Sequence, residues 1–141
     1  MKNLRRGFTL IELIIVLAIA GLIISLVFVA ARAAQRNARD TTRRADTQKL
    51  ATAIEQWAAN NNGALPKGTD MPSLKTNGYL DASKFKDPGK KEEYIILVQT
   101  NSLNPGFCFP KYMAYVPDSL TTPTKYSLET CLESGIHKYT P

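Results

Sequence analysis

The sequence predicts an α+β fold in which one long N-terminal helix packs on a small antiparallel β-sheet. An apolar run from Phe8 to Ala31 is followed by a stretch without helix breakers that reaches Asn60. The last third of the chain instead holds short runs of β-branched and aromatic residues, which prolines and glycines separate. Because a helix and a sheet must each bury an apolar face, we expect them to pack on each other in one small domain.

The apolar run begins directly after a short basic stretch, Met1 to Gly7, and it contains a single acid, Glu12. As a helix it is about 36 Å long, enough to cross a hydrocarbon core of about 30 Å. It exceeds the apolar region of about 7–15 residues that an ordinary secretory signal carries. A plain single-span anchor fits the length but leaves Glu12 unexplained, since an unpaired acid in a lipid-facing helix is costly. In a third interpretation, the carboxylate of Glu12 is paired with a partner rather than exposed to lipid alone.

The second half of the helix is predicted to be amphipathic. Ala, Arg, Gln and Lys, which favour helix, are frequent between Ala31 and Asn60. Apolar residues recur there at spacings of three and four, at Leu50, Ala53, Ile54, Trp57 and Ala58. We therefore expect one continuous helix from about Phe8 to Asn60, whose second half lies against a domain with Trp57 in the core. The segment from Asn60 to Pro66 ends it, since Asn and Gly tolerate the left-handed conformation.

The remaining chain predicts short elements separated by turns. Met71 to Tyr79 could hold a short helix, and turns are expected at Asp87-Pro88-Gly89 and Asn104-Pro105-Gly106. Four segments read as strands, namely Tyr94–Gln99, Phe107–Phe109, Tyr112–Val116 and Lys125–Cys131. Because they are closely spaced along the chain, we expect an antiparallel meander.

Charge and cysteine content do not by themselves determine the cellular compartment of the domain. The formal net charge of +6 falls by three, the charges of Lys2, Arg5 and Arg6, to +3 if the basic stretch is removed. Basic residues flank both ends of the apolar run, so the positive-inside rule does not decide orientation. Cys108 and Cys131 would pair in an exported domain, contributing roughly 3 kcal/mol, and would be free thiols in a cytosolic one. The membrane-length run favours export.

No Ser/His/acid set, glycine-rich phosphate loop or metal-ligand cluster appears in the sequence, so we expect no enzymatic activity and no cofactor. Two cysteines with one histidine, His137, are too few for a structural zinc site, and we expect His137 to be exposed.

The segment Arg6-Gly7-Phe8-Thr9-Leu10-Ile11-Glu12 resembles the cleavage junction of type IV prepilins and of the pseudopilins of type II secretion and competence systems. The resemblance joins a basic leader, a glycine at the junction, a phenylalanine after it, a glutamate four residues later and a membrane-length apolar run. It extends weakly over the whole chain. Asn61 to Pro66 is similar to the family's helix exit, Gly78-Tyr79-Leu80 with Asp87-Pro88 to a segment before its sheet, and Cys108 and Cys131 match its C-terminal disulfide.

The resemblance implies a division of the chain into a leader (1–7), a membrane and filament-core helix (8–31), its amphipathic continuation (32–62) and a small globular domain (63–141). A prepilin peptidase would cut between Gly7 and Phe8 and methylate the new amine of Phe8. Glu12 would then pair with the terminal amine of a neighbouring subunit and set the register of a helical filament. Many family members carry a proline near the end of the apolar run, whereas Ser25 to Val29 contains none.

The implied partners are copies of the chain or other pilins, the peptidase and N-methyltransferase, a pilus or type II secretion assembly platform, and membrane lipid before assembly. The implied location is the cytoplasmic membrane, with a single span and the C-terminal domain outside the cytoplasm, and then an extracellular pilus or a periplasmic pseudopilus. A DNA-binding competence pilin, a type II secretion pseudopilin and an unrelated single-span protein are the alternatives.

Two further sites, one for calcium and one for anionic partners, are conceivable on this scaffold. Some pseudopilins bind calcium, but Asp118, Glu129 and Glu133 are scattered and lack the spacing of a calcium loop. A basic ridge could contact phosphates of DNA, pair with Asp40 and Asp46 between subunits, or meet lipid headgroups. It would consist of Arg32, Arg36, Arg39, Arg43 and Arg44.

Overall fold

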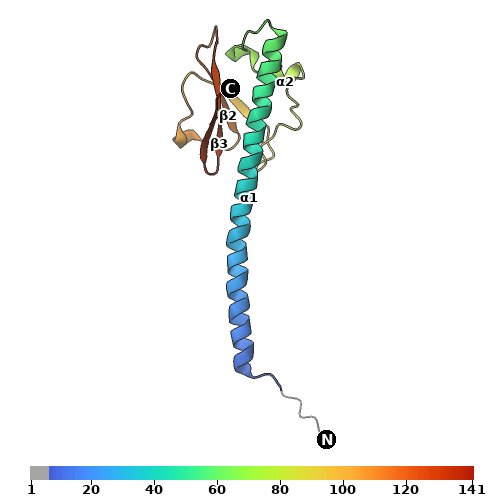
Figure 1. Ribbon diagram of the computed structural model, residues 1–141, viewed down its shortest axis with the longest axis vertical. Coiled ribbons are helices and arrows are strands. Elements are labelled where there is room, and N and C mark those ends of the chain that lie inside the picture. Colours follow the sequence, from blue (N-terminus) through green and yellow to red (C-terminus); the bar gives the residue numbers. More distant parts are fainter. Residues whose placement is uncertain (1–6) are drawn as a thin grey trace. The chain divides into compact units, whose positions relative to one another are not determined.

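The computed structural model describes residues 7–141 (Figure 1). Residues 1–6 of the expected leader, with Lys2, Arg5 and Arg6, lie outside the described residues. The chain divides into two compact units between Asn37 and Ala38. One helix, α1 (Leu10–Asn60), contributes to both units. The second unit also contains η1 (Gly68–Asp70), α2 (Ser73–Thr76), β1 (Ile95–Val98), η2 (Pro105–Phe107), β2 (Tyr112–Pro117), β3 (Tyr126–Leu132) and β4 (Gly135–Tyr139).

The first unit is helical from Leu10 onward, as the apolar composition predicted. Among the described residues, α1 is the helix long and apolar enough to cross a membrane, with a mean hydropathy of 3.2 over its most apolar window. The hydroxyl of Ser25 donates to the carbonyl oxygen of Gly21 at 2.9 Å, one helical turn earlier. This polar group is therefore satisfied within the helix and needs no water.

In the second unit, one face of α1 packs against the domain. Leu50, Ala53 and Ile54 are buried, and Trp57 is half-buried against the same core, as the spacing predicted. The helix ends where Asn62 adopts a left-handed conformation with φ of 55°. The amide of Gly63 then donates to the carbonyl oxygen of Ala58 at 2.8 Å, which closes the last turn.

The four strands form one mixed sheet in the order β1-β2-β3-β4. Strands β2 and β3 are antiparallel, as expected, and β4 is antiparallel to β3, but β1 runs parallel to β2. The expectation of a fully antiparallel meander is therefore wrong at β1. The reason lies in residues 99–111, because a connection of this length allows a crossover where a hairpin would need only a few residues.

Two local predictions also differ from the structure. Phe107–Phe109 is not a strand, because the Asn104-Pro105-Gly106 turn continues into η2 within the crossover. Strand β4 was not predicted, and it follows β3 through a tight turn in which Gly135 has a φ of 134°. The predicted short helix is confirmed as the single turn α2.

The crossover is held on the sheet by the disulfide between Cys108 and Cys131, whose Cα atoms are 5.4 Å apart. Leu103, Ala114 and Cys131 form a small apolar cluster beneath it. The amide of Leu103 donates to the carboxylate of Glu129 at 2.6 Å. The expected pairing of the two cysteines is thus present, and it ties the crossover to a central strand.

Candidate processing and assembly site

The junction between Gly7 and Phe8 is open. Both residues are exposed, and the Phe8 side chain is 87 % exposed. A Cβ atom built on Gly7 would meet no atom of the described chain within 4 Å, and Gly7 does not have a positive φ. Neither backbone conformation nor crowding within the described chain therefore requires glycine here.

Thr9 and Glu12 form a capping box at the start of α1. The backbone amide of Thr9 donates to Oε2 of Glu12 at 2.9 Å, and its hydroxyl donates to the same oxygen at 2.8 Å. The amide of Glu12 approaches the Thr9 hydroxyl oxygen at 3.4 Å in return. This arrangement was not predicted, although Thr9-Leu10-Ile11-Glu12 has the S/T-x-x-E spacing that signals it.

The capping box uses only one oxygen of the Glu12 carboxylate. Among residues 7–141, no hydrogen bond or ion pair reaches the other oxygen, Oε1. The first basic residue that follows Glu12 is Arg32, about five helical turns away. Within the described chain, Glu12 therefore has hydrogen-bond donors but no cation.

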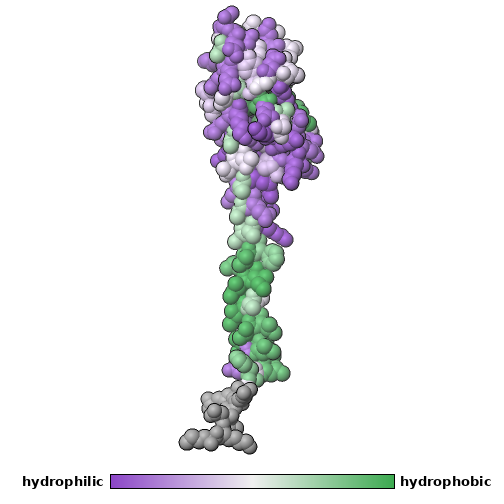
Figure 2. Space-filling model, turned by 90° about the vertical axis from the view of Figure 1, so that its right-hand side faces the viewer, coloured by the Kyte–Doolittle hydropathy of each residue, from purple (hydrophilic) through white to green (hydrophobic). Residues whose placement is uncertain are grey.

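Exposed apolar side chains occupy most of the visible face of the first half of α1 (Figure 2). The large apolar side chains between Phe8 and Val29 are each at least 52 % exposed. Burying one such side chain stabilises by about 1.5–3 kcal/mol. A surface of this extent is covered in water-soluble states, so it requires either lipid or other helices around it.

Comparison with known proteins bears on this same segment. Residues 2–28 match the family model described as the prokaryotic N-terminal methylation motif. This motif is the prepilin-type signal of type IV pilins and pseudopilins, so the resemblance seen at the junction is confirmed. No curated protein and no solved structure matches the chain.

The motif has consequences for the chain as a whole. It supports a type IV pilin- or pseudopilin-like protein and indicates a structural subunit rather than an enzyme. It also implies processing by prepilin peptidase, and together with the apolar helix it fits membrane anchoring followed by pilus assembly.

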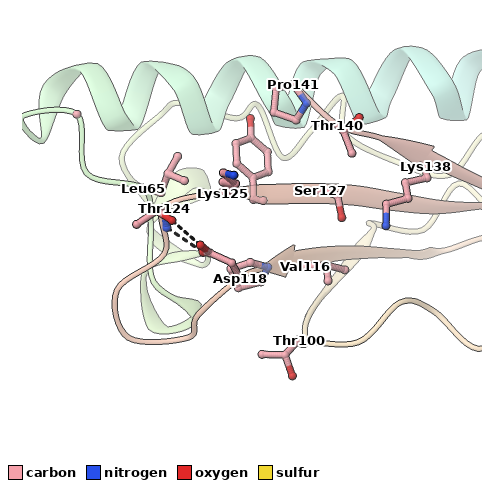
Figure 3. A pocket seen from close by; sticks show the side chains of 13 residues that line it. Leu65, Thr100, Val116, Asp118, Thr124, Lys125, Ser127, Lys138, Thr140 and Pro141 are labelled. Atoms are coloured by element: carbon pink, nitrogen blue, oxygen red, sulfur yellow. Dashed lines mark hydrogen bonds between the residues drawn. The ribbon is translucent and has the colours of Figure 1, made fainter.

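The three carboxylates weighed as calcium ligands serve separate structural roles. Asp118 lies beside a surface hollow of about 660 Å³, where it accepts hydrogen bonds from the amide and hydroxyl of Thr124 (Figure 3). The hydroxyl bond, with the backbone bonds of the loop, lowers the pKa of Asp118 to about 2. Glu129 is bonded to the crossover, and Glu133 pairs with Arg39. Among residues 7–141, no group of acidic, histidine or cysteine side chains could hold a metal ion.

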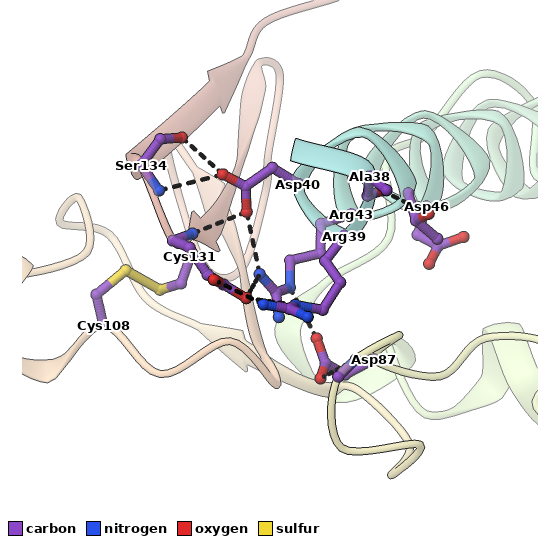
Figure 4. A network of polar contacts seen from close by, with 12 residues as sticks. Ala38, Arg39, Asp40, Arg43, Asp46, Asp87, Cys108, Cys131 and Ser134 are labelled. Atoms are coloured by element: carbon purple, nitrogen blue, oxygen red, sulfur yellow. Dashed lines mark hydrogen bonds and ion pairs between the residues drawn. A yellow bond between two sulfur atoms is a disulfide. The ribbon is translucent and has the colours of Figure 1, made fainter. Parts of the chain in front are cut away.

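The five arginines do not form one exposed ridge. Arg32, Arg36 and Arg44 are exposed, but Arg43 is 1 % exposed and lies inside the second unit. Its Nε donates to Asp87 at 2.8 Å and its Nη1 to Asp40 at 3.1 Å (Figure 4). The prediction of a ridge is therefore wrong at Arg43, because a buried guanidinium cannot reach DNA, lipid or a neighbouring subunit.

The pairing expected between subunits occurs instead within the chain. Asp40 also accepts bonds from the backbone amides of Glu133 and Ser134, at the turn between β3 and β4. Arg39 pairs with Glu133 at 2.5 Å. Asp46 accepts from Lys49 at 2.7 Å and from the Tyr94 hydroxyl at 3.1 Å. These carboxylates join α1 to the sheet.

His137 on β4 is half-buried rather than exposed as expected. Burial, together with the nearby charge of Arg44, lowers its pKa below the usual value. Its environment suits a neutral imidazole packed between the helix and the sheet.

Proposed function

We propose that this chain is a structural subunit of a type IV pilus or pseudopilus, cut between Gly7 and Phe8 and polymerised through its N-terminal helix. The observation that carries the proposal is the methylation motif on an exposed apolar run whose one carboxylate, Glu12, has no cation among residues 7–141. We assign Gly7 to the peptidase site. The described chain itself does not require glycine there, which supports a role for the small residue in a peptidase site that accepts little bulk.

Glu12 would supply the register of the filament. Cutting after Gly7 exposes an amine on Phe8, and this cation in one subunit can approach Oε1 of Glu12 in the next. A buried carboxylate is costly alone and tolerable when paired. Subunits that are out of register would leave the acid unpaired, so the pair selects one stagger. Repetition of a head-to-tail contact that does not close gives a helical filament.

Processing is tested by the intact mass of the chain from cells with and without prepilin peptidase. The expected product lacks residues 1–7 and carries one additional methyl group on Phe8. An unchanged N-terminus in peptidase-positive cells would refute the proposal.

Assembly is tested separately with Glu12→Gln, which keeps the shape and removes the charge. We expect normal cutting and methylation but a loss of filaments sheared from the cell surface or purified after reconstitution. Ser25→Ala is the matched control, because its hydroxyl bonds only within the helix, and it should assemble normally. Normal filament yield from Glu12→Gln would exclude the pairing role.

A further inference from the structure

One surface of the second unit combines unpaired lysines with exposed aromatic rings. Lys90, Glu92, Phe109, Pro110, Lys111 and Tyr112 line a shallow hollow of about 330 Å³. Phe109 is 55 % exposed and meets Tyr112 edge to face, with ring centres 5.8 Å apart. The Lys111 ammonium lies 6.0 Å from the centre of the Tyr112 ring. We call Lys90, Phe109, Lys111 and Tyr112, together with the exposed Lys91 that follows Lys90 in the chain, the lysine–aromatic surface.

The charge of this surface is positive. Lys111 is 3.3 Å from Glu92, so these two charges offset each other. The ammonium groups of Lys90 and Lys91 have no hydrogen bond or ion pair with any residue from 7 to 141. The neighbouring acids are already paired with other cations, since Glu92 pairs with Lys111 and Glu93 with Lys75. Asp87 is buried against Arg43. The surface therefore keeps two uncompensated cations.

The loop that carries the lysines and the segment that carries the aromatic residues are each held in place by contacts within the second unit. The carboxylate of Asp87 accepts bonds from the amides of Gly89 at 3.0 Å and Lys90 at 2.7 Å, and Arg43 holds that carboxylate from α1. The aromatic half follows Cys108 directly and is fixed by the disulfide to β3. Side chains presented on fixed backbone lose less entropy on binding than side chains on a mobile loop.

The lysine–aromatic surface lies at the end of the second unit through which the chain enters. Tyr112 pairs with the start of β1, and Asp87 is bonded to Arg43, five residues after Ala38. Six residues lie between Ala31, the end of the apolar run, and Ala38, the first residue of the second unit. The chain therefore enters the second unit shortly after the apolar run ends.

We propose that the lysine–aromatic surface binds the anionic phospholipid headgroups of the membrane that anchors the precursor. The inference rests on the membrane anchoring in the proposed function. Charge complementarity selects the ligand, because lysines near an anionic bilayer each favour contact by about fivefold. Phe109 and Tyr112 fit the same partner, since aromatic rings with a polar edge prefer the interface between lipid and water. An acidic protein surface would use the lysines but would not explain the exposed phenylalanine.

The test places a fluorescent reporter in the full-length chain. Phe109→Trp in a Trp57→Phe background is reconstituted in nanodiscs of phosphatidylcholine, with or without phosphatidylglycerol, containing lipids brominated near the glycerol. We expect strong quenching of the introduced tryptophan in the anionic discs and weak quenching in the neutral ones. Lys90→Gln/Lys91→Gln should weaken the contact on the order of 25-fold, and raised salt should weaken it as well.

The matched control is Lys67→Gln/Lys125→Gln, which removes two charges from exposed lysines at the far end of the second unit. It should leave the quenching unchanged. Hydrogen exchange of residues 108–112 in the unaltered chain provides a second measurement, because it does not depend on the substitutions Phe109→Trp and Trp57→Phe.

The outcomes separate the two proposals. A chain that does not enter the nanodiscs refutes the anchoring and with it the proposed function. A chain that enters but shows equal quenching in both lipids, or none, overturns only the lipid contact. Protection of residues 108–112 that arises only in assembled filaments also overturns it and assigns the surface to a contact between subunits.

Discussion

Replacing Arg43 by methionine is expected to destabilise the second unit by about 3 kcal/mol. The guanidinium is buried and donates to the buried carboxylates of Asp40 and Asp87. Removing one partner of a buried ion pair costs about 3–5 kcal/mol, because the remaining charge is uncompensated. The lower end applies here, since Asp40 and Asp87 both keep hydrogen bonds from backbone amides.

The assay is denaturant unfolding of the full-length chain in detergent at pH 7, followed by fluorescence. The chain has one tryptophan, Trp57, which packs half-buried against the core and reports unfolding directly. Arg44→Met is the control, because Arg44 is the exposed neighbour on the same helix and should change stability by less than about 0.5 kcal/mol. Arg43→Met/Asp87→Asn should recover part of the loss. A value for Arg43→Met within about 1 kcal/mol of the control would refute the reasoning.

The same site predicts a dependence on pH. Burial raises the pKa of Asp87, but the hydrogen bond from Arg43 and those from backbone amides outweigh it, so the pKa lies below its usual value. A carboxyl with a lowered folded pKa stabilises the fold above its unfolded pKa of about 3.9, and this stabilisation is lost as pH falls. Without Arg43, burial dominates and acidification relieves the buried charge. The stability difference between the native chain and Arg43→Met should therefore narrow as pH falls below about 4.

Three further substitutions test other parts of the structure. Cys108→Ala/Cys131→Ala should lower stability by about 3 kcal/mol in the same unfolding assay, and a thiol reductant should lower the stability of the native chain but not of this variant. Ile54→Ala should cost about 2–5 kcal/mol because Ile54 is fully buried, whereas Thr52→Ala on the exposed face should cost little. Thr9→Val should remove the side-chain half of the cap, costing about 1 kcal/mol, and speed hydrogen exchange in the first turn of α1, an effect that Ser25→Ala should not produce.

Local sequence patterns predicted much of the fold. The apolar run and the spacing of Leu50, Ala53 and Ile54 predicted α1. Short runs of β-branched and aromatic residues between turns predicted β1, β2 and β3. The parallel pairing of β1 could not be predicted in this way, because it depends on the path of the crossover rather than on any residue of β1. Strand β4 was not predicted, because its five residues directly follow a tight turn and their burial pattern is a mixture of exposed and half-buried side chains.

The burial of Arg43 was missed for a different reason. An arginine between Arg39 and Arg44 suggests a solvated face, and composition alone supports that interpretation. Position on the helix points the other way, because Asp40, Arg43 and Thr47 continue the spacing of three and four that leads to Leu50 and Ile54. The apolar face of α1 thus extends into a polar segment that is buried as well. Such a polar continuation becomes evident only when its partners, Asp87 and the turn after β3, are located in space.

The capping box changes how the role of Glu12 should be understood. Thr9 donates to Oε2 alone, so the box orders the first turn of α1 and leaves Oε1 accessible. A cation from a neighbouring subunit could bind Oε1 without displacing Thr9, and assembly would then add an interaction without breaking the cap. Before assembly, the same carboxylate has dipolar donors but no opposite charge within the described chain, which is an unfavourable state in lipid. The gain on meeting an amine is largest in that environment, because a low dielectric strengthens the attraction between opposite charges. In the proposed assembly, Thr9 satisfies Oε2 of Glu12 in the membrane, and the amine of a neighbouring subunit would add the missing opposite charge in the filament.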